Sequence, residues 1–145
     1  MITRPLLFDA SSVFTLVRAL QGKAPDLFWE GSTVSLAYYE VGNAVWREGF
    51  LLKRIVPQEA AQLLNALFAM LGTMDVTVLD DEGLGNAILD MAGKLHVTYY
   101  DAAYLTEAQR SGKILVTDDE KLAQAAKRVG VRTLTSTTIR QQPRT

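Results

Sequence analysis

The chain has 145 residues, of which 48% are hydrophobic, and it carries a formal net charge of −1. This length and composition predict one domain with a substantial apolar core, and they exclude a second domain. Because the chain has no cysteine, disulfides and thiolate metal sites are also excluded. No secretory pattern and no membrane-spanning apolar run occur, so we expect a cytoplasmic protein with a core at about 6–134 and a polar tail at 135–145.

The net charge alone does not decide whether the chain binds nucleic acid. A phosphate-binding surface usually carries a basic excess, which is missing here. If four acids were gathered into one metal site, however, the rest of the chain would carry +3 instead of −1. We then expect weak, salt-sensitive binding through local basic rims.

The first predicted strand ends in an acid. Leu6–Phe8 is a short apolar run, Asp9 follows it, and a helical pattern then runs from Val13 to Leu20 behind two serines. Asp9 is either the cap of this helix or a member of a site at the carboxyl end of the strand.

A second acid lies on a helix. Residues 23–32 are predicted to be a connection whose Phe28 and Trp29 cover an edge of the core, and a helical pattern extends from about Val34 to Gly49. Glu40 and Asn43 are three residues apart and therefore share a face of this helix. Glu40 is either a solvated boundary residue or a site residue.

The helix that Pro57 opens continues to Leu71 and has an unusually wide apolar arc. It is either buried on both sides or in contact with another chain. A strand at 74–79 then leads to an acidic helix start at 80–82, which the helix dipole explains. His96 is the only histidine, so neither a histidine metal cluster nor a catalytic triad can form.

The third quarter of the chain contains two further acids. A helix is predicted to begin near Asp101, a buried strand spans Lys113–Val116, and Asp119 opens a helix to Val129 before a last strand at 131–134. The alternation of strands and helices predicts an α/β fold, an α/β/α sandwich with a central, mainly parallel sheet.

The sequence thus offers four candidate acids, Asp9, Glu40, Asp101 and Asp119, and three of them occur where an apolar strand or a buried helix meets the same edge of the parallel sheet. Carboxylates placed side by side repel each other, so such a cluster is expected only where a cation neutralises it. Ligands that offer only oxygen select a hard ion, Mg²⁺ or Mn²⁺.

These acids stand in four short motifs that resemble those of PIN domains, with the closest likeness to the VapC ribonuclease toxins of prokaryotic toxin–antitoxin pairs. The resemblance covers nearly the whole chain, in motif order and in length. The motifs are Leu7-Phe8-Asp9-Ala10-Ser11, Tyr39-Glu40-Val41-Gly42-Asn43, Tyr100-Asp101-Ala102-Ala103-Tyr104 and Val116-Thr117-Asp118-Asp119.

The resemblance implies a PIN-like fold and a Mg²⁺-dependent endoribonuclease that cleaves RNA, forms a homodimer and binds an antitoxin protein. It makes the four acids catalytic and assigns the metal to Asp9, Asp101 and Asp119. The residues it implies as supporting are Ser11, Asn43, Thr117 and Asp118. A Thr or Ser two residues before the final acid favours Asp119 over Asp118, which would add an outer ligand or only charge.

Two rival functions are excluded by their residues, and two others remain as alternatives. A haloacid-dehalogenase-type phosphatase needs a second Asp where Ser11 stands, and a receiver domain needs an acidic pair and a lysine that are not found in the right places. A PIN-fold module that binds RNA or protein without cutting it would lack one of the acids, and none is missing. A PIN nuclease of RNA processing, unrelated to an antitoxin, also fits the sequence.

Overall fold

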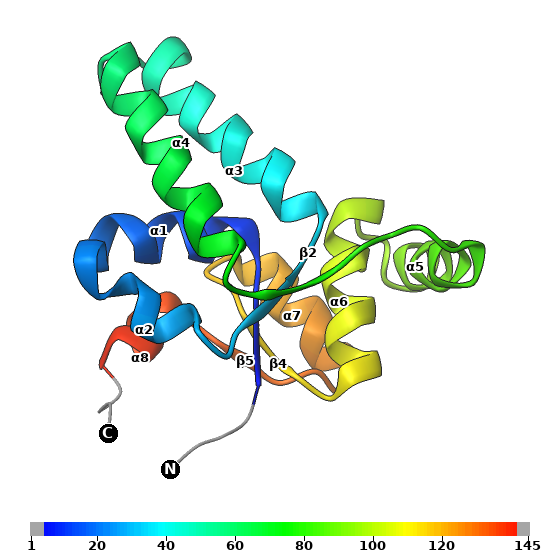
Figure 1. Cartoon of the computed structure of the whole chain (residues 1–145). Helices are drawn as coiled ribbons and strands as arrows, with labels where there is room; N and C mark the ends of the chain where they lie inside the picture. The colour runs from blue at the N-terminus through cyan, green and yellow to red at the C-terminus, as the bar shows by residue number, and fades with distance from the viewer. Residues whose placement is uncertain (1–4, 142–145) are drawn as a thin grey trace.

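The computed structural model describes residues 5–141, which form a parallel five-stranded sheet with helices on both faces (Figure 1). The strand order is β3-β2-β1-β4-β5, and every neighbouring pair is parallel. The strands are β1 (Leu6–Phe8), β2 (Ser32–Val34), β3 (Asp75–Thr77), β4 (Ile114–Val116) and β5 (Thr133–Leu134). The predicted α/β/α sandwich is confirmed.

The helices occupy the connections between the strands. They are α1 (Ala10–Leu20), α2 (Ala24–Phe28), α3 (Leu36–Trp46), α4 (Pro57–Leu71), α5 (Glu82–Leu95), α6 (Tyr99–Ser111), α7 (Glu120–Arg128) and α8 (Ser136–Gln141), with a 3₁₀ turn η1 (Gln21–Lys23) and a π-helical turn η2 (Arg47–Leu51). Within residues 5–141, none of these helices is long and apolar enough to cross a membrane.

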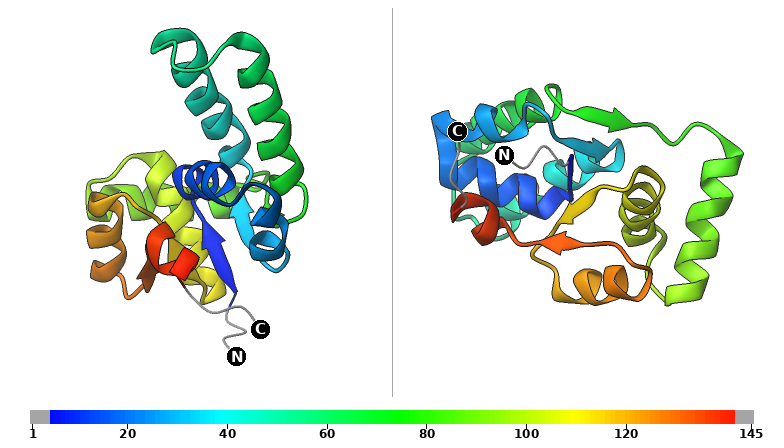
Figure 2. Two further views of the ribbon diagram at one scale, coloured as in Figure 1. Left: turned by 90° about the vertical axis from the view of Figure 1, so that its left-hand side faces the viewer. Right: turned by 90° about the horizontal axis from the view of Figure 1, so that it is seen from below.

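Two hydrophobic clusters lie on opposite faces of the sheet because successive residues of a strand point to opposite sides. Phe8 packs into a cluster with residues of α1, α2, α3, α4 and α8. Leu7 packs into the other cluster with residues of α5, α6 and α7. Helices α3 and α4 form a hairpin that projects beyond the sheet (Figures 1 and 2).

Strand β2 was not predicted, because its sequence Ser32-Thr33-Val34 is mostly polar and lies in a segment expected to be a connection. All three residues are buried. The Ser32 hydroxyl donates a hydrogen bond to the carbonyl of Leu6 (3.1 Å), and the Thr33 hydroxyl donates one to the carbonyl of Phe8 (2.8 Å). These bonds satisfy the buried hydroxyls, so a polar segment occupies an inner strand at little cost.

The segment beyond residue 134 also differs from the expectation of a polar tail. Residues 136–141 form α8, and Ile139, which is 2% exposed, belongs to the cluster around Phe8. One apolar residue among polar neighbours gives no periodic signal, which explains the error. The expected tail residues 142–145 lie outside the described residues.

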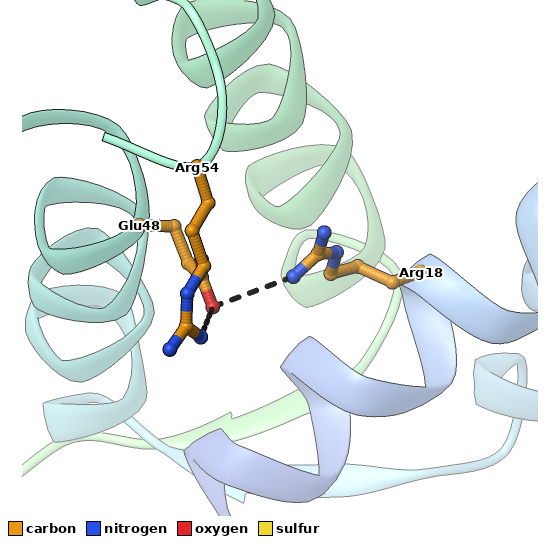
Figure 3. A network of polar contacts seen from close by, with 3 residues as sticks. All are labelled: Arg18, Glu48 and Arg54. Atoms are coloured by element: carbon orange, nitrogen blue, oxygen red, sulfur yellow. Dashed lines mark hydrogen bonds and ion pairs between the residues drawn. The ribbon is translucent and has the colours of Figure 1, made fainter. Parts of the chain in front are cut away.

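The turn of the α3–α4 hairpin is joined to α1 by a small ion-pair network (Figure 3). Oε1 of Glu48 in η2 forms ion pairs with Arg18 of α1 (3.6 Å) and with Arg54 of the α3–α4 connection (3.4 Å). The Glu48 side chain is only 15% exposed, so the network is shielded from water more than a surface pair. It links the end of α3 that is distant from the sheet to α1.

We expect Ile139→Ala to lower the free energy of unfolding by about 2 to 4 kcal/mol, because the substitution leaves a cavity beside Phe8. Thr137→Ala is the matched control, since Thr137 is exposed on the same helix, and it should change this quantity by less than about 0.5 kcal/mol. Urea denaturation followed by circular dichroism measures both. Equal effects of the two substitutions would show that α8 does not contribute to the core.

Candidate active site

The topology creates a crevice between β1 and β4. The chain leaves β1 towards β2 on one side and leaves β4 towards β5 on the other, so the connections diverge at the carboxyl ends of these neighbouring strands. In open α/β sheets, ligands bind at such a switch point. Asp9 directly follows β1, and Asp119 lies three residues beyond the end of β4.

A cavity of about 760 Å³ opens at this crevice, and all four predicted acids line it. Asp9 comes from the β1–α1 junction, Glu40 from α3, Asp101 from the first turn of α6 and Asp119 from the start of α7. Two of the predicted supporting residues, Ser11 and Asn43, also line it. The remaining lining residues are Ala10, Leu36, Tyr39, Ala44, Arg47, Tyr100, Tyr104 and Leu122.

Asp9 is the most buried of the four acids, at 5% exposed, and it serves as the cap of α1. Its Oδ1 accepts hydrogen bonds from the backbone N–H of Ser12 (2.8 Å) and the hydroxyl of Ser11 (3.1 Å). Burial raises the pKa of Asp9, and hydrogen bonds from Thr117, Ser12 and Ser11 oppose this rise. The capping and the site interpretations of Asp9 are therefore compatible.

Glu40 is held by a tyrosine from another helix. The Tyr104 hydroxyl donates a hydrogen bond of 2.6 Å to Oε1 of Glu40. Burial raises the pKa of Glu40, as do the negative charges of Asp9 and Asp101, while the bond from Tyr104 lowers it. The pKa of Tyr104 is itself raised by burial and by Glu40, so the phenol stays protonated and remains a donor.

Asp101 sits in the first turn of α6, which begins at Tyr99 and is capped by Thr98, slightly earlier than predicted. Its backbone N–H donates to the Thr98 hydroxyl (3.0 Å). Within residues 5–141, its carboxylate has no hydrogen bond or ion pair. Burial raises the pKa of Asp101, and the charges of Asp119 and Asp9 raise it further.

The adjacent residues Asp118 and Asp119 have different roles in the structure. Asp119 lines the cavity and caps α7 through Oδ1, which accepts from the N–H groups of Lys121 (2.9 Å) and Leu122 (3.2 Å). Asp118 does not line the cavity, and both of its oxygens accept hydrogen bonds from Ser136 at the start of α8 (2.7 and 2.6 Å). Asp119 is thus the acid that faces the other three.

Thr117 connects two of the acids without lining the cavity. Its hydroxyl accepts a hydrogen bond from the N–H of Asp119 (3.1 Å), and its side chain also hydrogen-bonds Asp9. Asn43 lies on the cavity wall one helical turn after Glu40.

Sequence reasoning assigned no role to Tyr104 or Arg47, although both line the cavity. The spacing contained a signal for each residue. Tyr104 is three residues after Asp101 on α6, and Arg47 is seven after Glu40, so each shares a helix face with a predicted acid.

The chemistry of this site fits a hard cation. The acids offer only oxygen, three of them have raised pKa values, and none of the four takes part in an ion pair within residues 5–141. A divalent ion would neutralise this charge, and Asp9, Asp101 and Asp119 would hold it. As the side chains stand, no three acidic or histidine groups of the described residues are close enough to enclose an ion.

Two curated proteins of Pyrobaculum aerophilum are similar to this chain, whereas no protein-family model matches it. One is named exonuclease VapC9 and is 34% identical over 100 residues, which cover 68% of this chain and 70% of the relative. The other is named ribonuclease VapC3 and is 35% identical over 127 residues, which cover 82% of this chain and 92% of the relative.

Solved structures agree with these similarities. PAE2754 from Pyrobaculum aerophilum is 29% identical and superimposes with a TM-score of 0.74 over 96% of this chain and 98% of its own. FitAcB from Neisseria gonorrhoeae, at 14% identity, superimposes with a TM-score of 0.59 over 90% and 97% of the two chains, a likeness of fold alone.

We expect Asp101→Asn, in the absence of metal, to unfold at the same or a higher temperature than wild type, because the substitution removes repulsion among the acids. Mg²⁺ at a hundredfold excess over its Kd should stabilise wild type by about 2.7 kcal/mol and the variant much less. Thermal melts with Mg²⁺ and with chelator measure both effects.

Asp81→Asn is the control, because Asp81 caps α5 through Gly83 and Leu84 and Asn caps equally well. In chelator, raised carboxyl pKa values make the folded protein bind protons more tightly than the unfolded chain. Wild-type stability should therefore fall as the pH rises from about 4 through the raised pKa values, less steeply in Asp101→Asn. An undiminished Mg²⁺ shift in Asp101→Asn would remove Asp101 from the site.

Proposed function

The chain belongs to the VapC-like PIN-domain proteins, as its motifs predicted, and on this basis we propose that it is a Mg²⁺-dependent endoribonuclease. The two curated relatives are named a ribonuclease and an exonuclease, which supports hydrolysis of phosphodiesters. The observation that carries the proposal is the convergence of four carboxylates from separate elements on one cavity, with no ion pair to neutralise them in the described residues.

In this proposal, Asp9, Asp101 and Asp119 act as ligands and Glu40 completes the catalytic set. Bound Mg²⁺ supplies a water of lowered pKa and neutralises charge on the phosphate. Tyr104 fixes one oxygen of Glu40, which leaves the other to accept a hydrogen bond from the attacking water. Ser11 and Thr117 hold the Asp9 carboxylate in place. No protein nucleophile is required.

The rim of the cavity suits single-stranded RNA. Tyr39 is 82% exposed and Tyr100 is 60% exposed, and both line the cavity, where their rings can stack on unpaired bases. Arg47 provides a positive charge at the same rim for a phosphate. We infer that binding is weak and depends on salt, because Arg47 is the one basic residue among the described residues that line the cavity and its contact with a phosphate releases counterions.

Asp9→Asn and Asp101→Asn should each abolish Mg²⁺-dependent cleavage of a pool of structured RNAs while leaving the circular dichroism spectrum unchanged. Asp119→Asn should do the same, because Asn preserves the cap of α7. Asp118→Asn is the matched control and should retain cleavage, because Asp118 is bound to Ser136. Activity within tenfold of wild type in both Asp9→Asn and Asp101→Asn would refute the site assignment.

We further propose that the chain is the toxin of a type II toxin–antitoxin pair and forms a homodimer. A groove of about 640 Å³ runs between α4 and the α1–α2 segment, lined by apolar residues such as Val17, Leu63 and Met70. At the tip of the α3–α4 hairpin, Trp46 and Phe50 are 50% and 54% exposed. Apolar surface of this extent favours protein partners.

Light scattering at micromolar concentration should give the mass of a dimer, and a co-expressed antitoxin should block cleavage through an Arg or Lys that enters the acidic cavity. Replacing that basic residue of the antitoxin by Ala should restore cleavage while the two proteins still co-purify. A monomeric mass would contradict the dimer, and inhibition that survives the replacement would contradict the capping of the cavity.

A further inference from the structure

A second pocket, of about 220 Å³, adjoins the acidic cavity. It lies among the start of α3, the ends of β2 and β3, and the facing sides of α5 and α6, and most of its lining is apolar. Leu36, Tyr39 and Tyr100 line both hollows. A molecule bound in the acidic cavity therefore reaches the second pocket across these three side chains.

Glu107 of α6 is the one charged residue that lines this pocket. It is 8% exposed, and within residues 5–141 its carboxylate has neither a hydrogen bond nor an ion pair. Most of the Glu107 side chain is covered by its neighbours, but its unpartnered oxygens are not among the fully buried ones of the described residues, so a ligand in the pocket can reach them. A carboxylate accepts but does not donate hydrogen bonds, so the pocket suits a ligand that presents N–H donors.

The mouth of the pocket is aromatic. Tyr39 and Tyr100 are exposed, and Tyr99 stands beside them with its hydroxyl bonded to the carbonyl of Gly85 (3.0 Å). Aromatic rings of this kind stack on unpaired bases, and the edges of those bases then provide hydrogen bonds. A flat ring with N–H groups on one edge could stack on the tyrosine rings and donate hydrogen bonds to Glu107.

We propose that this pocket binds a guanine base of the RNA, next to the phosphodiester held in the acidic cavity; the inference rests on the proposed function. Guanine carries two adjacent N–H donors on its Watson–Crick edge, which match the two oxygens of Glu107. Adenine and cytosine place an acceptor beside their amino group, and uracil places a carbonyl on each side of its single N–H. Both of these arrangements repel a carboxylate.

The spacing along α6 supports this arrangement. Glu107 lies six residues after Asp101, which is about 9 Å along the helix axis and about 120° around it, so Asp101 lines the acidic cavity and Glu107 lines the second pocket. A nucleoside attached to the cleaved phosphate covers this span, so one helix presents a metal-site acid to the phosphate and Glu107 to the base.

Fluorescein-labelled uridine decamers with a single central G, A, C or U test the inference without cleavage when anisotropy is measured with Mg²⁺ in a protein that carries Glu40→Gln, because this variant keeps the three proposed metal ligands. The G-containing decamer should bind at least about tenfold more tightly than the others, because a hydrogen bond to a charged group changes the affinity by more than a factor of ten. Adding Glu107→Gln should reduce this preference to less than about threefold, whereas adding Asp90→Asn, at an exposed acid on α5, should keep it. Equal binding of all four decamers to the Glu40→Gln protein would overturn the inference.

Cleavage with Mg²⁺ separates this inference from the proposed function. Wild type should cut next to guanines, and Glu107→Gln should raise KM for G-containing RNA more than it changes kcat. Cleavage without any base preference would overturn the guanine pocket and leave the nuclease standing. A guanine preference in binding with no cleavage of any RNA would support the pocket and refute the nuclease.

Glu107→Leu distinguishes this ligand-binding role from a structural one. The variant should melt no lower than wild type and lose the guanine preference, whereas a structural role for Glu107 would lower the melting temperature. If a second copy of the chain covered the pocket, Glu107→Leu would change the mass seen by light scattering without changing base preference, and that result would overturn the inference.

Discussion

The mutual repulsion of carboxylates at the crevice between β1 and β4 is the constraint around which this molecule is built. Burial raises the pKa values of Asp9, Glu40 and Asp101, and the charges of neighbouring acids raise those of Glu40 and Asp101 further. A fold tolerates such a cluster only where rigid elements oppose the repulsion. Here three of the four acids lie at helix starts, where capping bonds or the helix dipole stabilise negative charge, and Glu40 is tied to Tyr104. The same bonds that stabilise the acids aim them at one cavity.

Hydroxyl groups complete this support from inside the sheet. Ser12 donates to backbone carbonyls of Asp9 and Val116, which joins the ends of β1 and β4 at the point where the acids emerge. Thr117 contacts both Asp9 and Asp119. On the other side of β1, Ser32 and Thr33 bind the carbonyls of Leu6 and Phe8. The crevice is thus held by short polar contacts that an apolar core alone would not direct.

The order of strands and helices was largely predictable from the sequence, because apolar runs such as Leu115-Val116 and caps such as Asp119 are local signals. Strand β2 and helices α2 and α8 were missed, because the side chains that define them are satisfied by tertiary contacts. The hydroxyl of Thr33 is paired with Phe8, and Ile139 is buried by other elements. The four acids were predicted to share a site, and they line one cavity. The hydrogen bonds between Asp118 and Ser136 could not be predicted, because the two residues are distant in the sequence. The lack of a partner for Glu107 could not be predicted either, because it depends on the side chains that form the pocket.

The acidic cavity and the second pocket differ in the ligands that their acidic groups can bind. A hard cation needs several oxygen ligands, which the four-acid cavity can offer and a lone carboxylate between apolar walls cannot. Tyr39 and Tyr100 stand between the two hollows and keep Glu107 apart from the cluster. A single carboxylate can accept two N–H donors from one neutral ring, whereas the four-acid cluster needs positive charge to offset its repulsion. In the proposed function, an RNA strand with a metal-bound phosphate and an unpaired base would meet both demands at once, so the pocket and the cavity would act as parts of one binding surface.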